Sequence, residues 1–183
     1  CRSRMPRRGQ FVYVRNHKRS GLCGIAGIWS KKDISTSRLE ALTVASETIA
    51  KRGPDAKGKA VFRKCALAHR RLSIIDTDLR SDQPMTKGSY SLIFNGEIYN
   101  YKELKKELVT KGHFFQTEGD TEVLLFGLIE EGVNLLKKVN GVFAFGFYHE
   151  SENSLILGRD RYDIKPIYYH RTDDGVIFGS SLG

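Results

Sequence analysis

Cysteine, proline and tryptophan are scarce in this sequence of 183 residues, which has 3, 4 and 1 of them. The odd cysteine count, without paired spacing, argues against a disulfide scaffold and a zinc knuckle and favours a reducing compartment. No apolar run reaches the ~20 residues that a membrane-spanning helix needs. We therefore expect a cytoplasmic protein with no membrane partner. Internal repeats and low-complexity tracts are also missing, and hydrophobic residues at 40% suffice for one buried core.

Acidic residues are absent from positions 1–22, which carry seven of the nine net positive charges. This basic segment keeps one alternative open, a nucleic-acid-binding protein whose binding depends on salt. The rest of the chain is nearly neutral, so we expect no nucleic acid to bind there. We interpret residues 1–22 as a basic leader that is disordered and is either cleaved or not translated, followed by one domain over residues 23–183.

The remaining pattern predicts strands at both ends of the chain and helices between them. Strands are expected at 23–29, 59–76, 89–94, 142–148, 155–157, 167–169 and 176–178, and the one at 167–169 is aromatic. Helices are expected after Ser37 and Asn100, each three residues before a glutamate as in a capping box, and over 121–131. Because strands and helices do not alternate strictly, the predicted fold class is α+β with mostly antiparallel strands.

Several short motifs follow one another in a fixed order, starting at Leu22-Cys23-Gly24-Ile25-Ala26-Gly27. The others are Arg52-Gly53-Pro54-Asp55, His69-Arg70-Arg71-Leu72-Ser73-Ile74-Ile75-Asp76, Gln83-Pro84-Met85, Asn95-Gly96-Glu97-Ile98-Tyr99-Asn100-Tyr101, Asp120-Thr121-Glu122, Gly141-Val142-Phe143-Ala144-Phe145, Arg159-Asp160-Arg161 and Ile164-Lys165-Pro166. Together the motifs resemble class II glutamine amidotransferases, most of all the glutaminase domain of glutamine-hydrolysing asparagine synthetases. The resemblance implies the N-terminal-nucleophile (Ntn) hydrolase fold, a four-layer αββα sandwich with two mostly antiparallel sheets.

The resemblance makes Cys23 the nucleophile, with its own α-amino group as the base. An α-amine titrates near pH ~8, which suits a base far better than a lysine does. The alternative is that Cys23 is a small buried hydrophobe in a strand, which is the commoner fate of a lone cysteine. The flanking motifs favour the nucleophile. The resemblance also assigns the oxyanion hole to the Asn95 side chain and the Gly96 backbone N–H. The competing interpretation of Asn95-Gly96 is a plain turn at the end of a strand.

Glutamine is a zwitterion, so its recognition needs a cation and an anion at a fixed separation. The resemblance assigns Arg71 to the α-carboxylate, which a guanidinium can hold with two parallel bonds, and Glu97 and Asp120 to the α-ammonium. The expected glutamine-binding residues are Arg71, Leu72, Ser73, Ile74, Ile75, Asn95, Gly96, Glu97 and Asp120. Alternatively, Asp120 is only the N-cap of the following helix and Arg71 a surface charge. Arg70 should face away from Arg71 on a strand.

Two features depart from the family pattern. The 22 residues before Cys23 would leave its nitrogen in an amide, which cannot act as a base. Asp163 replaces a glycine, which Asp tolerates because it adopts left-handed backbone more readily than most residues. We assign no metal and no cofactor to this domain.

We expect the synthetase domain, which would bind ATP and Mg, to be missing from this sequence, because no Ser-Gly-Gly-x-Asp-Ser loop occurs in it. The predicted function is glutamine hydrolysis that supplies ammonia for asparagine synthesis, with the synthetase domain as partner and a homodimer left open. The alternatives are the glutaminase domain of an amidotransferase that amidates a sugar or a peptide, and a truncated, inactive remnant that keeps the fold.

Overall fold

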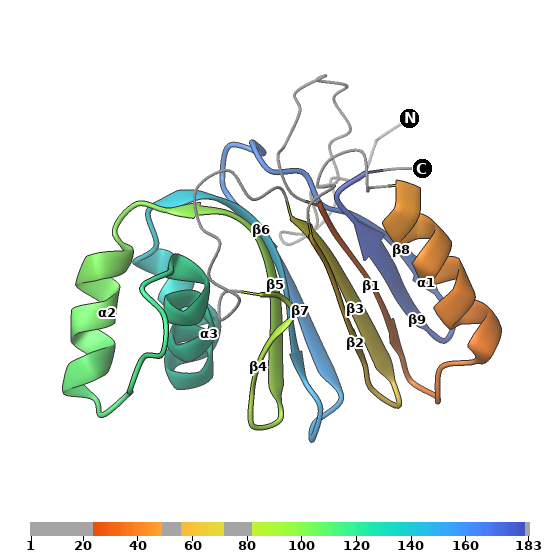
Figure 1. The fold of residues 1–183 in the computed structure, drawn as a ribbon, viewed down its shortest axis with the longest axis horizontal. Helices are drawn as coiled ribbons and strands as arrows, with labels where there is room; N and C mark the ends of the chain where they lie inside the picture. The colour runs from red at the N-terminus through yellow and green to blue at the C-terminus, as the bar shows by residue number, and fades with distance from the viewer. Residues whose placement is uncertain (1–23, 49–55, 72–81, 182–183) are drawn as a thin grey trace, which may run out of the picture.

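Two antiparallel sheets lie face to face, with helices on their outer sides (Figure 1). The computed structural model describes residues 24–48, 56–71 and 82–181. In those residues the 5-stranded sheet has the order β2 (Ala56–Val61), β3 (Cys65–Arg71), β1 (Gly24–Ser30), β9 (Gly175–Gly179), β8 (Tyr168–Thr172). The 4-stranded sheet has the order β4 (Met85–Lys87), β5 (Tyr90–Ile98), β6 (Gly141–His149), β7 (Ser154–Arg159).

The helices divide between the two outer faces (Figure 1). On one side, α1 (Thr36–Thr48) covers the 5-stranded sheet; on the other, α2 (Tyr101–Thr110) and α3 (Asp120–Glu131) cover the 4-stranded sheet. A short 3-10 helix, η3 (Gly132–Lys137), continues from α3 and buries Leu135 against it. This arrangement is the predicted α+β, four-layer αββα sandwich.

Three apolar clusters correspond to the three interfaces between the four layers. The outer cluster under α2 and α3 contains Leu92, Phe94, Val123, Leu124 and Phe145 among others. The central cluster joins the sheets and contains Ile25, Leu67, Ile93, Ala144 and Phe178 with Cys65 and Tyr148. The α1 cluster is smaller and consists of Ala26, Ile28, Leu42, Ala66 and Ala68. Consecutive strand residues alternate between clusters because side chains on a strand point to opposite faces.

Asn153, in the β6–β7 turn, ties the two sheets together at one end. Its carbonyl accepts a bond from the Trp29 indole N–H at 3.0 Å, and its side-chain Nδ2 donates to the Ser30 carbonyl at 3.1 Å. The Tyr148 hydroxyl donates to its Oδ1 at 3.1 Å. Asn153 adopts positive φ, 47°, which asparagine tolerates. The strand ends that carry the predicted site lie at the opposite end of the sheets (Figure 1).

Three local predictions were wrong. The strand expected to end at Asn95-Gly96 continues to Ile98, because β6 pairs with β5 along its whole length. The first helix begins at Thr36, so Ser37 lies inside it. Asn100 makes no side-chain cap; its amide instead donates to the Lys138 carbonyl at 2.9 Å and accepts from the Asn140 N–H at 2.9 Å. A tertiary contact has replaced the expected local one. The predicted helix over 121–131 is confirmed.

Candidate active site

Asn95 lies near the end of β5 and is only 3% exposed. Of the two residues before it, Phe94 points to the outer cluster and Ile93 points to the central cluster. By the same alternation, the Asn95 side chain faces the other sheet. A carboxamide on this face offers an N–H donor at the interface between the sheets, near the end of both.

Gly96 follows Asn95 where β6 passes close by. It pairs with Phe143, and a Cβ at position 96 would stand 2.6 Å from the Phe143 Cα and collide with the Val142 carbonyl. Only glycine fits, so the backbone of this segment is fixed by close packing. Asn95-Gly96 is therefore not a turn.

Asp120 is the first residue of α3, and its carboxylate reaches the end of β5. Its Oδ2 accepts a hydrogen bond from the Ile98 N–H at 2.9 Å. Gly119, not Asp120, occupies the N-cap position, which removes the alternative of a simple helix cap. Burial raises the pKa of Asp120, and the nearby Glu97 charge raises it further, while the backbone N–H of Ile98 opposes both. Glu97 and Asp120 therefore form a pair of neighbouring acidic groups.

Neither of these carboxylates forms an ion pair with a lysine or arginine in the described part of the chain. Two neighbouring carboxylates favour binding of a cation between them, because like charges repel. The α-ammonium of an amino acid is a cation of suitable size. This is the role predicted for both residues, and it stays a prediction.

β1 begins at the end of the sheets where β5 ends (Figure 1). β1 starts there with Gly24 paired to Arg70, whereas β3, β5 and β9 end there. Ser180, fully buried after β9, holds this start in place: its Oγ accepts from the Ile25 N–H at 3.0 Å and its N–H donates to the Ile25 carbonyl at 2.8 Å. Cys23 is the residue before Gly24 in the sequence.

Several predicted site residues lie outside the described residues, namely Cys23, Leu72, Ser73, Ile74 and Ile75, as do residues 1–22. Arg71 is described only as the last residue of β3, where it pairs with Ala56. Arg70 points to the outer side, since its Nε donates to the Ser46 carbonyl on α1 at 3.1 Å. The prediction that Arg70 does not bind glutamine agrees with this contact, and the role of Arg71 stays a prediction.

A family model described as a glutamine amidotransferase domain matches residues 22–183. The chain belongs to the glutamine amidotransferase family. Among curated relatives, it is 36% identical to asparagine synthetase [glutamine-hydrolyzing] 3 of Bacillus subtilis over 88% of this chain and 27% of that protein. It is also 36% identical to asparagine synthetase [glutamine-hydrolyzing] 2 of Oryza sativa, over 87% of this chain and 27% of the relative. The amidotransferase thus spans about a quarter of the length of these relatives.

Solved structures support the fold. The glutamine phosphoribosylpyrophosphate amidotransferase of B. subtilis, complexed with ADP and GMP, superposes with a TM-score of 0.67 at 24% identity over 86% of this chain and 42% of that one. An allosteric regulatory enzyme of purine biosynthesis gives a TM-score of 0.69 at 23% identity over 86% of this chain and 42% of the other. The Ntn-hydrolase fold expected from the motifs is confirmed.

Three residues that organise the backbone around the candidate site had no catalytic or binding role predicted from the sequence. Asp160 is 5% exposed, and its carboxylate accepts backbone N–H bonds from Phe143, Tyr162, Ile164 and Lys165. The loop after β7 is thereby tied to the start of β6. In this loop Asp163 has a φ of 58° and forms an ion pair with Arg159, so the expected left-handed backbone at Asp163 is confirmed.

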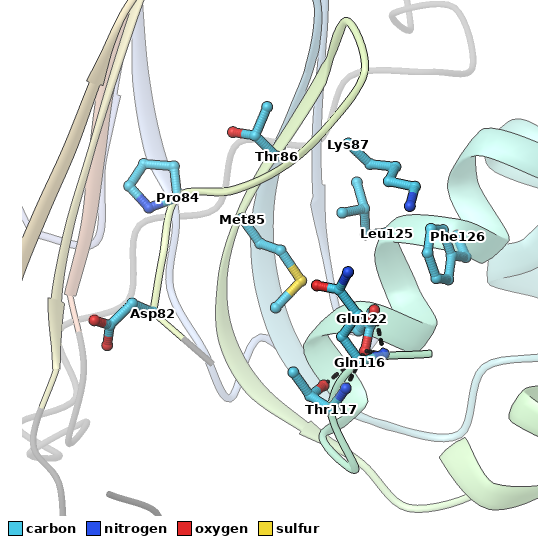
Figure 2. A pocket seen from close by; sticks show the side chains of 10 residues that line it. All are labelled: Asp82, Pro84, Met85, Thr86, Lys87, Gln116, Thr117, Glu122, Leu125 and Phe126. Atoms are coloured by element: carbon cyan, nitrogen blue, oxygen red, sulfur yellow. Dashed lines mark hydrogen bonds between the residues drawn. The ribbon is translucent and has the colours of Figure 1, made fainter. Parts of the chain in front are cut away.

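Glu122 is the second of these residues. Its carboxylate, 6% exposed in the first turn of α3, accepts from the Gln116 N–H, the Thr117 N–H at 2.7 Å and the Thr117 hydroxyl at 2.8 Å (Figure 2). These bonds fix the segment that leads into Asp120. A pocket of about 200 Å³ lies between β4 and α3, on the outer side of the 4-stranded sheet. Figure 2 shows the side chains that line it. Asn95 and Asp120 do not line it.

Gln83 is the third, and it lies in the Gln83-Pro84-Met85 motif. Its side chain contacts both β5 and α3. The motif marked this residue in the sequence, but no periodicity or spacing predicts a contact between such distant segments.

No group of three or more His, Cys, Asp or Glu side chains in the described residues is arranged to hold a metal ion. Across the same part of the chain, no helix combines the length and apolar character needed to cross a membrane.

Proposed function

We propose that this domain hydrolyses glutamine to glutamate and ammonia, with Cys23 as an N-terminal nucleophile. The observation that carries the proposal is the hydrogen bond from the Ile98 N–H to Asp120 Oδ2 at 2.9 Å. It joins the segment Asn95–Ile98 to the first residue of α3, at the sheet end where β1 begins. A buried amide donor and a pair of carboxylates thus lie on two joined segments in a member of the glutamine amidotransferase family.

The proposed reaction begins when the Cys23 Sγ attacks the carboxamide carbon and its thiol proton passes to the α-amine of Cys23. The oxyanion that forms accepts hydrogen bonds from Asn95 Nδ2 and the Gly96 N–H. The C–N bond then breaks, and ammonia leaves with the proton from the α-amine. Water attacks the resulting thioester, which releases glutamate and restores the thiol.

Substrate binding in this proposal divides between two charges. Glu97 and Asp120 receive the α-ammonium, and Arg71 with residues 72–75 receives the α-carboxylate and lines the pocket. The raised pKa of Asp120 supports this division, because burial and a neighbouring like charge both disfavour the ionised carboxylate. A bound ammonium would offset both effects and lower the pKa of Asp120.

The proposed acceptor of the ammonia is aspartate, which becomes asparagine. Support comes from the relatives, which are glutamine-hydrolysing asparagine synthetases matched over only 27% of their length. The unmatched part of those proteins is the proposed counterpart that uses ATP and Mg. The proposal also requires that residues 1–22 be absent or removed in the active enzyme, since an amide nitrogen cannot accept the thiol proton.

Replacing Asn95 tests the proposed oxyanion hole. In a chain that begins at Cys23, Asn95→Ala should lower kcat for ammonia release about 10²–10³-fold, as for other single oxyanion donors. Asn134→Ala is the matched control, because Asn134 lies on η3 and its side chain accepts a bond from the exposed Lys137. An Asn95→Ala protein that folds and keeps the wild-type kcat would refute the assignment.

A further inference from the structure

We infer that Gln83 is a positioning residue, whose side-chain amide clamps the strand that carries Asn95 to the helix that carries Asp120. The inference rests on the proposed function for its catalytic consequence. Its structural part rests only on contacts. Gln83 itself is not placed against the substrate.

The first contact is with β5. Gln83 Oε1 accepts a hydrogen bond from the Phe94 N–H, one residue before Asn95. This N–H lies beyond the end of β4, whose first residue Met85 pairs with Leu92. The ladder therefore gives Phe94 no partner on that side, and the Gln83 side chain supplies the acceptor. A partly buried N–H without an acceptor costs stability, so this bond holds the strand in place.

The second contact is with α3. Gln83 Nε2 donates to the Thr121 hydroxyl at 3.5 Å, one residue after Asp120. Thr121 is buried at 8% exposure, so the hydroxyl is a fixed point on the first turn of the helix. One planar amide thus contacts the neighbours of two predicted site residues on different elements.

The position of Gln83 is itself fixed. A Cβ at Gly58 on β2 would stand 2.8 Å from the Gln83 carbonyl carbon, so the Gln83 backbone lies directly against the other sheet. The amide therefore projects from an anchored backbone toward β5 and α3. Together with the bond from the Ile98 N–H to Asp120, it brackets Asn95–Ile98 at both ends.

This arrangement predicts a catalytic effect without loss of a substrate contact. If the clamp is lost, Asn95 is released from the geometry that the oxyanion requires, whereas the charged groups that bind glutamine remain. Small misplacements of such a donor lower the rate of the chemical step more than ground-state binding. The expected signature is a lower kcat with little change in KM.

The experiment compares Gln83→Met, Gln83→Glu and the control Thr86→Val, all in a chain that begins at Cys23. Met keeps the length of the side chain but loses the acceptor, whereas Glu keeps an acceptor for the Phe94 N–H. Thr86→Val breaks the Thr86–Ser91 hydroxyl contact in the β4–β5 hairpin, away from the site. Ammonia release gives kcat and KM, and backbone amide exchange reports protection at Phe94, with Leu67 in the central cluster as reference.

We expect Gln83→Met to lower kcat about tenfold with KM changed less than about threefold, and to speed exchange at Phe94 but not at Leu67. Gln83→Glu and Thr86→Val should keep kcat within about threefold of wild type. A folded Gln83→Met protein with the wild-type kcat overturns the inference. If Gln83→Met does not fold, Gln83→Glu decides: it must fold, protect Phe94 and retain kcat, and failure in any of these overturns the inference.

Failure of the proposed function is separately visible. A wild-type chain beginning at Cys23 that releases no ammonia refutes glutamine hydrolysis. In that case amide exchange still decides on the clamp: faster exchange at Phe94 in Gln83→Met supports it, and unchanged exchange refutes it.

Discussion

The two sheets are covered by helices in very different ways. Helix α3 buries eight of its 12 residues, and its side of the molecule is filled with large residues such as Leu124 and Phe145. On the other side, Leu42 is the buried residue of α1, and it packs against Ala26, Ala66 and Ala68, while Val44 is 63% exposed. Small residues let α1 lie close to the sheet but bury little apolar surface.

The difference extends to the polar contacts. Glu122 ties α3 to the preceding segment through buried hydrogen bonds. Helix α1 is tied by exposed or partly buried contacts, such as those from Lys59 to the Thr43 hydroxyl and from Arg70 to the Ser46 carbonyl. The half of the proposed site on β5 and α3 is thus built into the best-packed interface. The half next to β1 depends on strand pairing and on Ser180 more than on its helix.

Truncating a buried leucine on each helix should give the largest difference in stability between the α3 side and the α1 side. Leu124→Ala on α3 should cost about 3–5 kcal/mol of unfolding free energy, because the rigid surroundings leave a cavity. Leu42→Ala on α1 should cost about 2 kcal/mol, since α1 can settle toward the small residues beneath it. Denaturant unfolding followed by circular dichroism measures both. Equal losses would show that the two helical covers do not differ in packing.

The loss of the Glu122 carboxylate should give the second-largest difference in stability between the two sides. Glu122→Leu leaves the N–H groups of Gln116 and Thr117 without their acceptor in a buried setting, at a cost of about 3 kcal/mol. Thr43→Ala removes the exposed contact on α1 and should cost less than about 0.5 kcal/mol. The same unfolding experiment compares them. A Glu122→Leu protein as stable as Thr43→Ala would remove the polar half of the contrast.

Neutralising Asp120 should have the smallest effect on stability, and of the opposite sign. Because its pKa is raised above the ordinary 3.8, the native state binds its proton more tightly than the unfolded chain does. The stability that Asp120 contributes is present at low pH and is lost as pH rises through the raised pKa. Asp120→Asn, whose amide oxygen can still accept the Ile98 N–H, should therefore become more stable relative to wild type as pH rises.

Glutamine binding by Asp120→Asn should weaken, although the stability of this variant relative to wild type rises with pH. If Asp120 binds the α-ammonium, Asp120→Asn should raise KM for glutamine by at least about tenfold. Thermal unfolding from acid to neutral pH, together with initial rates, measures both effects. A wild-type protein that gains stability over Asp120→Asn as pH rises would contradict the assigned pKa direction.

The sequence predicted some elements of this structure more closely than others. The continuous apolar run in β1 and the apolar pattern of α3 predicted both elements with nearly the observed bounds. The burial of both elements follows from the pattern of consecutive residues in the sequence. The end of β5 was missed because Asn-Gly usually marks a turn, and only pairing with the distant β6 carries the strand past it.

The candidate site shows the same limit. Asn95, Gly96, Glu97 and Asp120 came from motifs, and the structure joins the strand that carries the first three to Asp120 through the Ile98 N–H. Gln83, Glu122 and Asp160 received no catalytic or binding role, and each acts through hydrogen bonds to backbone groups that no local pattern reveals. The same applied to Asn100, where a long-range contact replaced the expected cap.

The most direct test of the account is glutamine turnover by a chain whose first residue is Cys23. It should release glutamate and ammonia in equal amounts, whereas the Cys23→Ala protein and the chain that retains residues 1–22 should release neither above background. Intact mass confirms which residue is first in each sample. Ammonia release by folded Cys23→Ala at the wild-type rate, or none from the correctly processed wild-type chain, would contradict the account.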